Sequence, residues 1–416
     1  MRIRSITCFL TPKIPLDEAM LRQAGAFLSN ARSAFQEKGY EVQTVRLATT
    51  PFPLWLPIAS PDHAVQLAQQ IGQITQSIGV DYASLGPAIP QFPSSYALIP
   101  DMLKAAQNLF FGGVIASGEE GISIRAIHQC AQVIHRAASL SNDGFANLRF
   151  TALANVPPGS PFFPAAYHLG EGPAFAIATE AADLAVEAFS HAESLFQAQQ
   201  DLVASLELHA KAITAIGDEL ADAFQVDFTG IDFSLAPFPE ASRSIGTAFE
   251  CLGVANVGLH GSLAAAALIA SSIDSARFRH VGFSGLMLPL LEDSTLAQRA
   301  AQDGLTINDL LLYSAVCGTG LDTLPLPGDV TEEQLAAILL DLAALAMRLN
   351  KPLTARLMPI PGKAAGDTTD FDFAYFANSR VFPVRAEALY GLLGSKQNLN
   401  TAFHIRSLQR LHPTDI

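Results

Sequence analysis

An aspartate inside an apolar run is the strongest chemical feature of this sequence. Asp232 interrupts Phe228–Leu235, which otherwise has the composition of a buried strand, and Pro237 and Pro239 follow it. A carboxylate buried without a partner is costly, so Asp232 must be paired, hydrogen-bonded or bound to a ligand. Parallel α/β sheets bind ligands at strand ends, and we therefore predict a catalytic or binding role. The alternative is an aspartate that only caps the next turn.

A glycine-rich turn presents a histidine and a serine shortly afterwards. His260 lies between Gly258 and Gly261, and Ser262 stands at the start of an alanine-rich helix. Histidine is the side chain suited to a general base near neutral pH. The free N–H groups of a helix start can hold a carboxylate or phosphate, so Ser262 is a candidate substrate contact. The alternative is a plain helix cap beside a solvent-facing histidine.

A cysteine stands at a second glycine-rich turn. Cys317 follows an apolar helix and precedes Gly318 and Gly320, with Asp322 a few residues further on. A cysteine in such a turn is a nucleophile if a nearby charge lowers its pKa. The alternative is a small buried apolar side chain. Asp322 either caps this turn or contributes to the substrate site.

His168 and Glu171 lie three residues apart in a loop with two glycines. A histidine and a carboxylate at this spacing can contact a substrate or share a proton. Together with Asp232 they could also ligate a divalent metal ion. In the simpler interpretation the histidine ring only bonds a neighbouring carbonyl.

Two further polar residues stand in strand-like segments. Arg356 lies inside the run Leu353–Met358 and needs a carboxylate or an anionic ligand, while Ser284 adds a hydroxyl near the start of the predicted strand Val281–Leu291. The sequence contains no Walker A motif, dinucleotide-binding fingerprint or nucleophile elbow, so no nucleotide cofactor is predicted.

The hydrophobic pattern that must position these residues alternates short strands with helices, which predicts an α/β fold with mainly parallel strands. The expected strands are Ile3–Leu10, Tyr40–Leu47, Val80–Leu85, Phe110–Ala116, Arg149–Ala154, Ala174–Thr179, Phe228–Leu235, Val281–Leu291 and Leu353–Met358. The expected helices are Leu16–Glu37, His63–Ser77, Ile122–Ala138, Glu180–Phe224 with a break near Gly217, Ser242–Leu252, Ser262–Ser272, Leu296–Ala301, Ile307–Val316, Glu332–Leu349 and the beginning of a tail from Ala386.

Composition limits the classes of protein that remain. The 416 residues are 50% hydrophobic and only 15% charged, with a net charge of −14 and no basic run, which excludes nucleic-acid binding through a positive face. No linker divides the chain, so we predict one domain over residues 1–416 with a less regular tail from about 386. The first residues do not resemble a signal peptide, and no apolar stretch is long enough for a membrane span. A cytoplasmic homo-oligomer with four unpaired cysteines is expected.

Taken together, these motifs resemble the domain-of-unknown-function 711 family, also called UPF 0210. The matching runs are Asp232–Pro239, Gly258–Gly261, Phe283–Gly285, Val316–Asp322 and, with them, His168–Glu171. The resemblance implies a ten-stranded α/β barrel similar to pyruvate formate-lyase and the ribonucleotide reductase large subunit, with helices outside and a loop carrying Cys317 toward the interior. The segment Tyr390–Gly394 does not match a glycyl-radical loop, and radical chemistry is therefore not expected.

Three functional hypotheses follow. In the first, the protein is an enzyme acting on a small anionic metabolite in a barrel pocket, with Cys317, His260 and Asp232 catalytic. His168, Glu171, Ser262, Ser284, Asp322 and Arg356 would then contact the substrate. In the second, a divalent metal ion held by His168, Glu171 and Asp232 does the chemistry. In the third, the protein binds or senses a metabolite without turnover. Fold alone does not choose among them.

Overall fold

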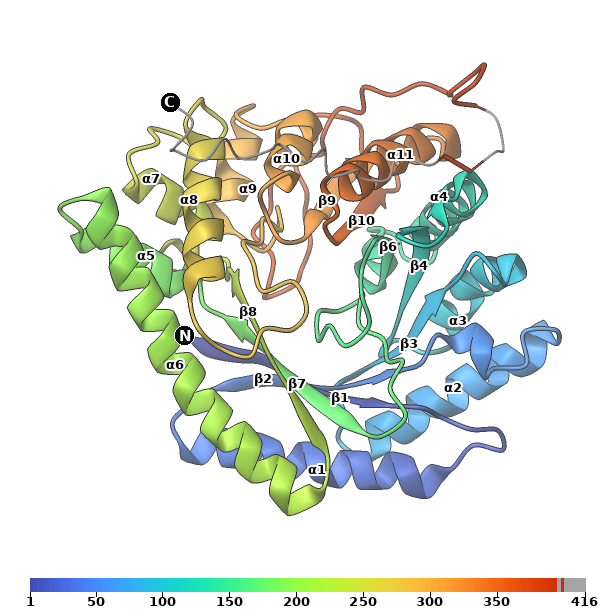
Figure 1. Ribbon diagram of the computed structural model, residues 1–416. Helices are drawn as coiled ribbons and strands as arrows, with labels where there is room; N and C mark the ends of the chain where they lie inside the picture. Colours follow the sequence, from blue (N-terminus) through green and yellow to red (C-terminus); the bar gives the residue numbers. More distant parts are fainter. Residues whose placement is uncertain (395–397, 400–416) are drawn as a thin grey trace, which may run out of the picture.

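The computed structural model describes residues 1–394 and 398–399, which form a ten-stranded mixed sheet and its surrounding helices (Figure 1). The strand order is β8-β7-β1-β2-β3-β4-β6-β10-β9, and β5 pairs with β4. The strands are β1 (Arg2–Leu10), β2 (Val42–Thr49), β3 (Tyr82–Ala88), β4 (Leu109–Ser117), β5 (Gly121–Ile122), β6 (Phe150–Ala154), β7 (Ala174–Glu180), β8 (Asp227–Ala236), β9 (Gly320–Pro327) and β10 (Leu353–Ile360).

The α-helices are α1 (Glu18–Glu37), α2 (Pro61–Ser77), α3 (Ile99–Ala105), α4 (Ile124–Ala138), α5 (Ala182–His191), α6 (Leu195–Phe224), α7 (Ile245–Cys251), α8 (Ser262–Ser275), α9 (Ser294–Ala301), α10 (Ile307–Ser314) and α11 (Glu332–Leu349). Short 3-10 helices occur at η1 (Phe52–Leu54), η2 (Pro93–Leu98), η3 (Phe145–Arg149) and η4 (Ala241–Arg243).

The strands fall into two groups of opposite direction. Strands β1, β2, β3, β4 and β6 run parallel to one another. The pairs β7–β8 and β9–β10 are each parallel internally, but they join the first group through the antiparallel pairs β1–β7 and β6–β10. The predicted α/β class with mainly parallel pairing is therefore confirmed.

The residues from 279 to 290, here called the linking segment, are hydrogen-bonded to both edges of this sheet. On the β8 side, the amide of Leu235 donates to the carbonyl of Gly285 at 3.2 Å. On the β9 side, the amide of Leu290 donates to the carbonyl of Asp322 at 3.1 Å. The segment thus holds the end of β8 near the start of β9, although the two are far apart along the sheet.

The predicted strand Val281–Leu291 is wrong in detail, because the linking segment makes only isolated bridges, at His280 and Pro289. Gly282 and Ser284 have φ of 63° and 35°, values that a strand residue does not adopt. These two turns interrupt the pairing with the backbone of β8. The amides of Phe283 and Ser284 donate instead to the side chain of Asp232 on that strand.

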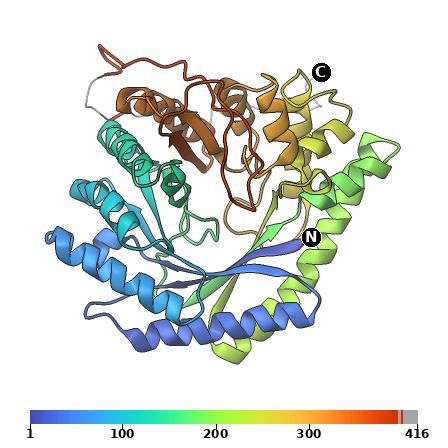
Figure 2. The same ribbon diagram turned by 180° about the vertical axis from the view of Figure 1, so that it is seen from behind.

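The helices lie on the outer side of the curved sheet, as Figures 1 and 2 show. Helix α1 illustrates why: Leu21, Phe27, Leu28 and Phe35 recur at helical spacing and are buried. Its first turn is capped by Asp17, whose carboxylate accepts from two backbone amides. Burying each such large apolar side chain contributes about 1.5–3 kcal/mol, which fixes the apolar face against the sheet.

Two loops fill the inner side of the sheet, within the curve drawn in Figures 1 and 2. The loop between β6 and β7 packs Phe163 against Phe9 and Phe110. The loop after β10 packs Phe371 and Phe376 against inward residues of the last strand. These aromatic side chains occupy much of the space beside the strands.

Other boundaries also differ from the sequence-based expectation. The long helix predicted over Glu180–Phe224 is divided at residues 192–194, not near Gly217, because Ser194 caps a new helix by accepting from the amide of Gln197. Strand β9 and helix α3 were not predicted. Of the tail from Ala386, the residues up to 394 contain no helix, and most of the remainder lies outside the described residues.

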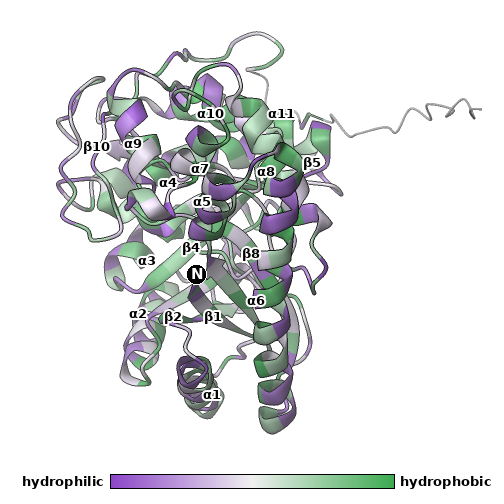
Figure 3. Ribbon diagram, turned by 90° about the vertical axis from the view of Figure 1, so that its left-hand side faces the viewer, coloured by the Kyte–Doolittle hydropathy of each residue, from purple (hydrophilic) through white to green (hydrophobic). Residues whose placement is uncertain are grey.

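Figure 3 shows hydrophilic and hydrophobic residues together along α1 and α6, as expected for helices with one face on the sheet. Within residues 1–394 and 398–399, no helix has the length and apolar character needed to cross a membrane.

Candidate functional site

Asp232 is buried on β8 and is held by the linking segment. Its carboxylate accepts hydrogen bonds from the amides of Phe283 at 3.0 Å and Ser284 at 2.9 Å, and from the hydroxyl of Ser234 at 2.5 Å. Burial raises the pKa of Asp232, although these three donors act in the opposite direction. The turn at Ser284, whose hydroxyl donates to the carbonyl of Ile231 at 3.1 Å, supplies the donors.

Cys317 lies on the other side of the linking segment from β8. The amide of the following residue, Gly318, donates to the carbonyl of Leu286 at 2.6 Å, and Gly318 packs directly on Gly285. The Cys317 thiol is 1% exposed and belongs to the apolar core. Its carbonyl accepts from Lys351, which also binds the carbonyl of Ala315 and so caps the end of α10. These contacts are those of a packing residue.

A chain of buried charges crosses the inner side of the sheet. Arg356 donates through Nε to Asp322 Oδ1 at 2.5 Å and through Nη2 to Glu292 Oε1 at 2.9 Å. Glu292 also forms an ion pair with Arg4. The side chains of Arg356, Asp322 and Glu292 are at most 6% exposed. We call these four residues the charge network.

Three members of the charge network, Glu292, Arg4 and Arg356, have pKa values shifted toward their charged forms, whereas burial raises the pKa of Asp322. Burial alone would raise the pKa of Glu292, but Arg4 and Arg356 outweigh burial and lower it. Burial alone would lower the pKa of Arg356, but Asp322 and Glu292 raise it. Both guanidinium groups therefore keep their charge, and of the two partners expected for Arg356, a carboxylate or an anionic ligand, the structure shows carboxylates.

Arg46, on β2 beside this network, has no carboxylate partner among the described residues. Its Nε donates to the hydroxyl of Thr44 at 2.8 Å. Its guanidinium lies over two aromatic rings, 5.0 Å from the centroid of Phe163 and 5.8 Å from that of Tyr82. Burial and the neighbouring charge of Arg4 lower the pKa of Arg46 to about 9. The remaining donors of this guanidinium are free for a ligand.

The side chains of Arg46 and Arg356 face the inner side of the sheet because successive residues of a strand point to opposite faces. On β2, Val45 and Leu47 face the outer core, so Arg46 between them faces inward. On β10, Ala355 and Leu357 face the outer core, and Arg356 faces inward for the same reason. On β1, Arg4 lies at an irregularity between Ile3 and Ser5 in the pairing with β7, and such bulges redirect side chains.

These three arginines line a cavity of about 70 Å³, here called the arginine cavity. A water molecule needs roughly 10–15 Å³ of such space, so about five waters or one small molecule fit. The only carboxylate in its wall is that of Glu292, already paired with Arg4 and Arg356, and most other wall groups are aromatic or neutral polar. The wall consists of Arg4, Gln43, Thr44, Arg46, Tyr82, Phe110, Leu148, Phe163, Glu292, Arg356, Phe373 and Tyr375.

A second, smaller cavity connects Asp232 to the arginines. It measures about 10 Å³, and both Arg4 and Arg46 line it, as they line the arginine cavity. Asp232 and Ser234 also line it. Asp232 and the arginines therefore line neighbouring cavities, so two residues singled out in the sequence, Asp232 and Arg356, belong to one internal region.

His260 and Ser262 lie outside this region. His260 is exposed in the connection between α7 and α8, and its ring has no hydrogen-bond partner among the described residues. Ser262 is buried, and its hydroxyl donates to the carbonyl of Leu259 at 2.8 Å and accepts from the amide of Gly258. The start of α8 is thus closed by its own chain, and neither residue lines the internal cavities.

The side chains of His168 and Glu171, although close in sequence, lie in different surroundings. His168 is buried, stacks on Phe9 with centroids 5.9 Å apart, and lies 3.1 Å from the carbonyl of Gly172 through Nε2. Burial lowers the pKa of His168. Glu171 is exposed and faces a different, outer pocket. In residues 1–394 and 398–399 no three His, Cys, Asp or Glu side chains form a group that could hold a metal ion, so His168, Glu171 and Asp232 form no such group.

Sequence reasoning missed two central residues, Arg4 and Arg46. Both lie inside predicted strands, and Arg46 stands between two apolar residues, which is the same signal that identified Arg356. Glu180 was missed as well: it is 2% exposed at the end of β7 and accepts from Arg243 at 3.2 Å and from Gln43. A search for charges inside predicted strands would have found Arg4 and Arg46, whereas Glu180 was assigned to the start of a helix.

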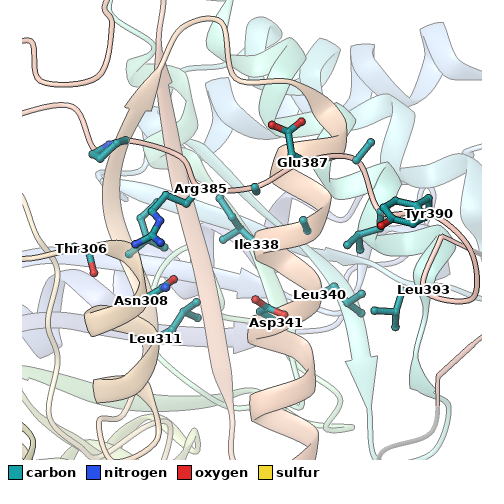
Figure 4. A pocket seen from close by; sticks show the side chains of 16 residues that line it. Thr306, Asn308, Leu311, Ile338, Leu340, Asp341, Arg385, Glu387, Tyr390 and Leu393 are labelled. Atoms are coloured by element: carbon teal, nitrogen blue, oxygen red, sulfur yellow. The ribbon is translucent and has the colours of Figure 1, made fainter.

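A larger pocket of about 510 Å³ lies elsewhere, between α10, α11 and the segment from 383 to 393 (Figure 4). Its ionisable groups, Asp341, Arg385 and Glu387, are exposed. Figure 4 shows Arg385 and Asn308 at one end and Tyr390 at the other. This groove lacks buried polar groups that would fix a ligand, so we place the candidate site at the arginine cavity.

The fold and the site define a mixed α/β protein whose sheet carries a buried charge network beside an internal cavity. The chain belongs to the family described as Uncharacterised ACR (DUF711), whose model matches residues 1–378. It is similar to the UPF0210 protein of Pyrobaculum arsenaticum, with 32% identity over 365 residues, 83% of this chain and 79% of the relative. A UPF0210 protein of Methanopyrus kandleri is 29% identical over 381 residues, covering 84% and 81%. The family resemblance drawn from the motifs is thereby confirmed.

Proposed function

We propose that this protein is an enzyme that binds a small anionic metabolite in the arginine cavity. The observation that carries the proposal is Arg46, a partly buried guanidinium that faces a cavity and has no carboxylate partner in the described part of the chain. Guanidinium groups bind carboxylates and phosphates through two parallel hydrogen bonds. The free donors of Arg46 are therefore matched to such a group.

The surroundings of Arg46 favour a ligand over a structural role. Arg4 and Arg356 are already neutralised by Glu292 and Asp322, so Arg46 is the cation whose charge is left uncompensated at this cavity. The pKa of Arg46 is lowered because burial and the charge of Arg4 both disfavour its charged form, as expected for a cation without a carboxylate partner. An anion bound here would relieve the repulsion between the two arginines.

Asp232 is the residue we propose for proton transfer. It lines the small cavity together with Arg4 and Arg46, and its raised pKa brings it closer to the range useful in acid–base catalysis. Cys317 does not line either cavity, and His260 is exposed, so neither belongs to the proposed reaction site. Binding without turnover is the second candidate, because both oxygens of Asp232 already accept hydrogen bonds from the protein.

We also propose that the sheet closes into an α/β barrel through the linking segment, as the resemblance to pyruvate formate-lyase implies. The hydrogen bonds from Leu235 and Leu290 on its two sides support this closure. Hydrogen exchange offers a test: both amides should exchange as slowly as those within β1 and β2. Rapid exchange of the Leu290 amide would show that the segment is not part of a closed sheet.

The function is tested by calorimetric titration with small carboxylates and phosphates at constant ionic strength, followed by Arg46→Gln. A hydrogen bond to a charged group contributes about 1.5–3 kcal/mol, so affinity should fall by about 10–150-fold. Arg22→Gln is the control, because Arg22 is 61% exposed on α1 and pairs only with Glu18. Equal affinities in the Arg46→Gln variant and the wild type would refute the proposed site.

Once a bound substrate is known, Asp232→Asn separates the two candidate functions. If Asp232 transfers a proton, this variant retains binding and loses turnover by at least about 100-fold. A wild-type protein that binds ligands but converts none of them would favour the metabolite-binding alternative.

A further inference from the structure

A third cavity adjoins the arginine cavity on the side of α3 and η3. It measures about 260 Å³, and we call it the outer cavity. Tyr82, Phe110, Leu148 and Phe373 line both cavities, so these four side chains form a shared apolar wall. A ligand that passes this wall would extend from one cavity into the other.

Two cations without acidic partners line the outer cavity. Arg149 is 6% exposed, and its Nη1 donates to the carbonyls of Ala106 at 2.8 Å and Leu109 at 3.4 Å. Burial lowers the pKa of Arg149 to about 10. Lys104 lies exposed in the last turn of α3. Neither Arg149 nor Lys104 has a carboxylate partner within the described residues.

The acidic groups near the outer cavity are engaged with other partners. Asp143 accepts from the amide of Phe145 at 3.0 Å, and Asp101 pairs with Arg136. Asp81 pairs with Arg32 and accepts from the amide of Val45. Asp372 precedes Phe373 but is exposed and does not line the cavity. The wall of the outer cavity thus contains two cations and no carboxylate, in a chain of net charge −14.

We infer that the outer cavity is a second anion subsite, so that the ligand carries two anionic groups separated by an apolar or planar body. One group would bind Arg46 in the arginine cavity. The other would bind Arg149 and Lys104, with the body held among Tyr82, Phe110 and Phe373. This inference rests on the proposed function, because it assumes that Arg46 binds the first anion.

The chemistry of the shared wall supports this ligand class. Aromatic side chains favour planar or apolar groups and offer few hydrogen bonds, so a strongly hydrated middle such as a sugar would lose bonds to water there. A dicarboxylate, or a carboxylate bearing a phosphate, around an unsaturated or aromatic core satisfies both ends. A monoanion would leave Arg149 and Lys104 without a partner.

Matched probe pairs test the inference: terephthalate against benzoate, and adipate against hexanoate, titrated calorimetrically at constant ionic strength. The two members of each pair share the same carbon skeleton or length and differ in one carboxylate. The dianion should bind the wild type at least about tenfold more tightly. Lys104→Glu should weaken the dianion by about tenfold and the monoanion by less than threefold, while Arg46→Gln weakens both.

The outcomes separate this inference from the proposed function. Arg46-dependent binding of benzoate or hexanoate, with no advantage for the dianion and no effect of Lys104→Glu, would overturn the second subsite alone. No binding of any probe to the wild type would overturn both. Because Lys104 is exposed, Lys104→Glu should fold normally; Arg149→Gln, checked by its melting temperature, gives a second measurement at the buried end.

Discussion

The charge network and Arg46 lie side by side on the inner face of the sheet but differ in how their charges are compensated. Arg356 is held by two carboxylates, whereas Arg46 has a hydroxyl and two aromatic rings. A compensated buried ion pair fixes geometry, and breaking it is strongly destabilising. An uncompensated guanidinium at a cavity is instead prepared for an incoming anion. Under the proposed function, the network positions the site and Arg46 binds the ligand.

The largest loss of stability is expected when a carboxylate of the charge network is removed. Glu292→Gln removes the carboxylate shared by Arg4 and Arg356, leaving both guanidinium groups with less compensation. Breaking a buried pair in this way costs about 3–5 kcal/mol, which urea unfolding would measure. Glu240→Gln is the control, because Glu240 is 51% exposed in its pair with Arg243. A loss below about 1 kcal/mol would show that the network is not a stabilising unit.

The same variant has a pH signature. The folded-state pKa of Glu292 is lowered by Arg4 and Arg356 against the effect of burial. A carboxylate of this kind contributes stability that is present above its unfolded pKa of about 4.3 and is lost as the pH falls through the folded value. The Glu292→Gln variant should therefore lose less stability than the wild type below about pH 4.3.

Replacing Asp232 tests how much a buried carboxylate held only by hydrogen bonds contributes to stability. Asp232→Ala leaves the amides of Phe283 and Ser284 and the hydroxyl of Ser234 without their acceptor. Each unsatisfied buried donor costs about 1–3 kcal/mol, offset in part by relief from burying the charge, so we expect a net loss of about 2–4 kcal/mol. Asp227→Ala, at an exposed position on the same strand, should change stability by less than about 0.5 kcal/mol.

The pH dependence of anion binding tests the uncompensated region directly. Burial and Arg4 lower the pKa of Arg46 to about 9, and only the protonated guanidinium binds an anion. Affinity measured by titration calorimetry should therefore be constant from about pH 6 to 8 and fall about tenfold per unit above 9. An affinity that stays constant to about pH 10.5 would show that Arg46 keeps its proton and that the repulsion from Arg4 is weak.

The smallest effect on stability and on anion affinity is expected for His260, which lies away from both the charge network and Arg46. His260→Ala should change the free energy of unfolding by less than about 0.5 kcal/mol and leave anion affinity unchanged, because the ring is exposed and unpartnered among the described residues. A loss of turnover in this variant would instead restore the catalytic role that its glycine-rich surroundings suggested. Thermal unfolding and the same titration measure both quantities.

The sequence alone was informative about local structure and about which charges need partners. Helix α11 was predicted with its observed bounds, and the structure shows a capping box between Thr331 and Gln334 at its start. Asp232 and Arg356 were identified correctly as buried charges that require partners, since an apolar strand cannot bury an uncompensated charge. The family was also visible in short motifs spread along the chain.

Only the tertiary structure decided which charges meet. Arg4 and Glu292 are 288 residues apart, and Arg356 and Glu292 are 64 apart, so no local spacing indicates either pair. The sequence also misplaced His260 and failed to identify Arg46. A histidine between glycines was expected in the site and lies at the surface, while an arginine in an ordinary strand lies at the cavity. Strand alternation determines that a side chain faces inward, but sheet order and the irregular linking segment determine what it faces.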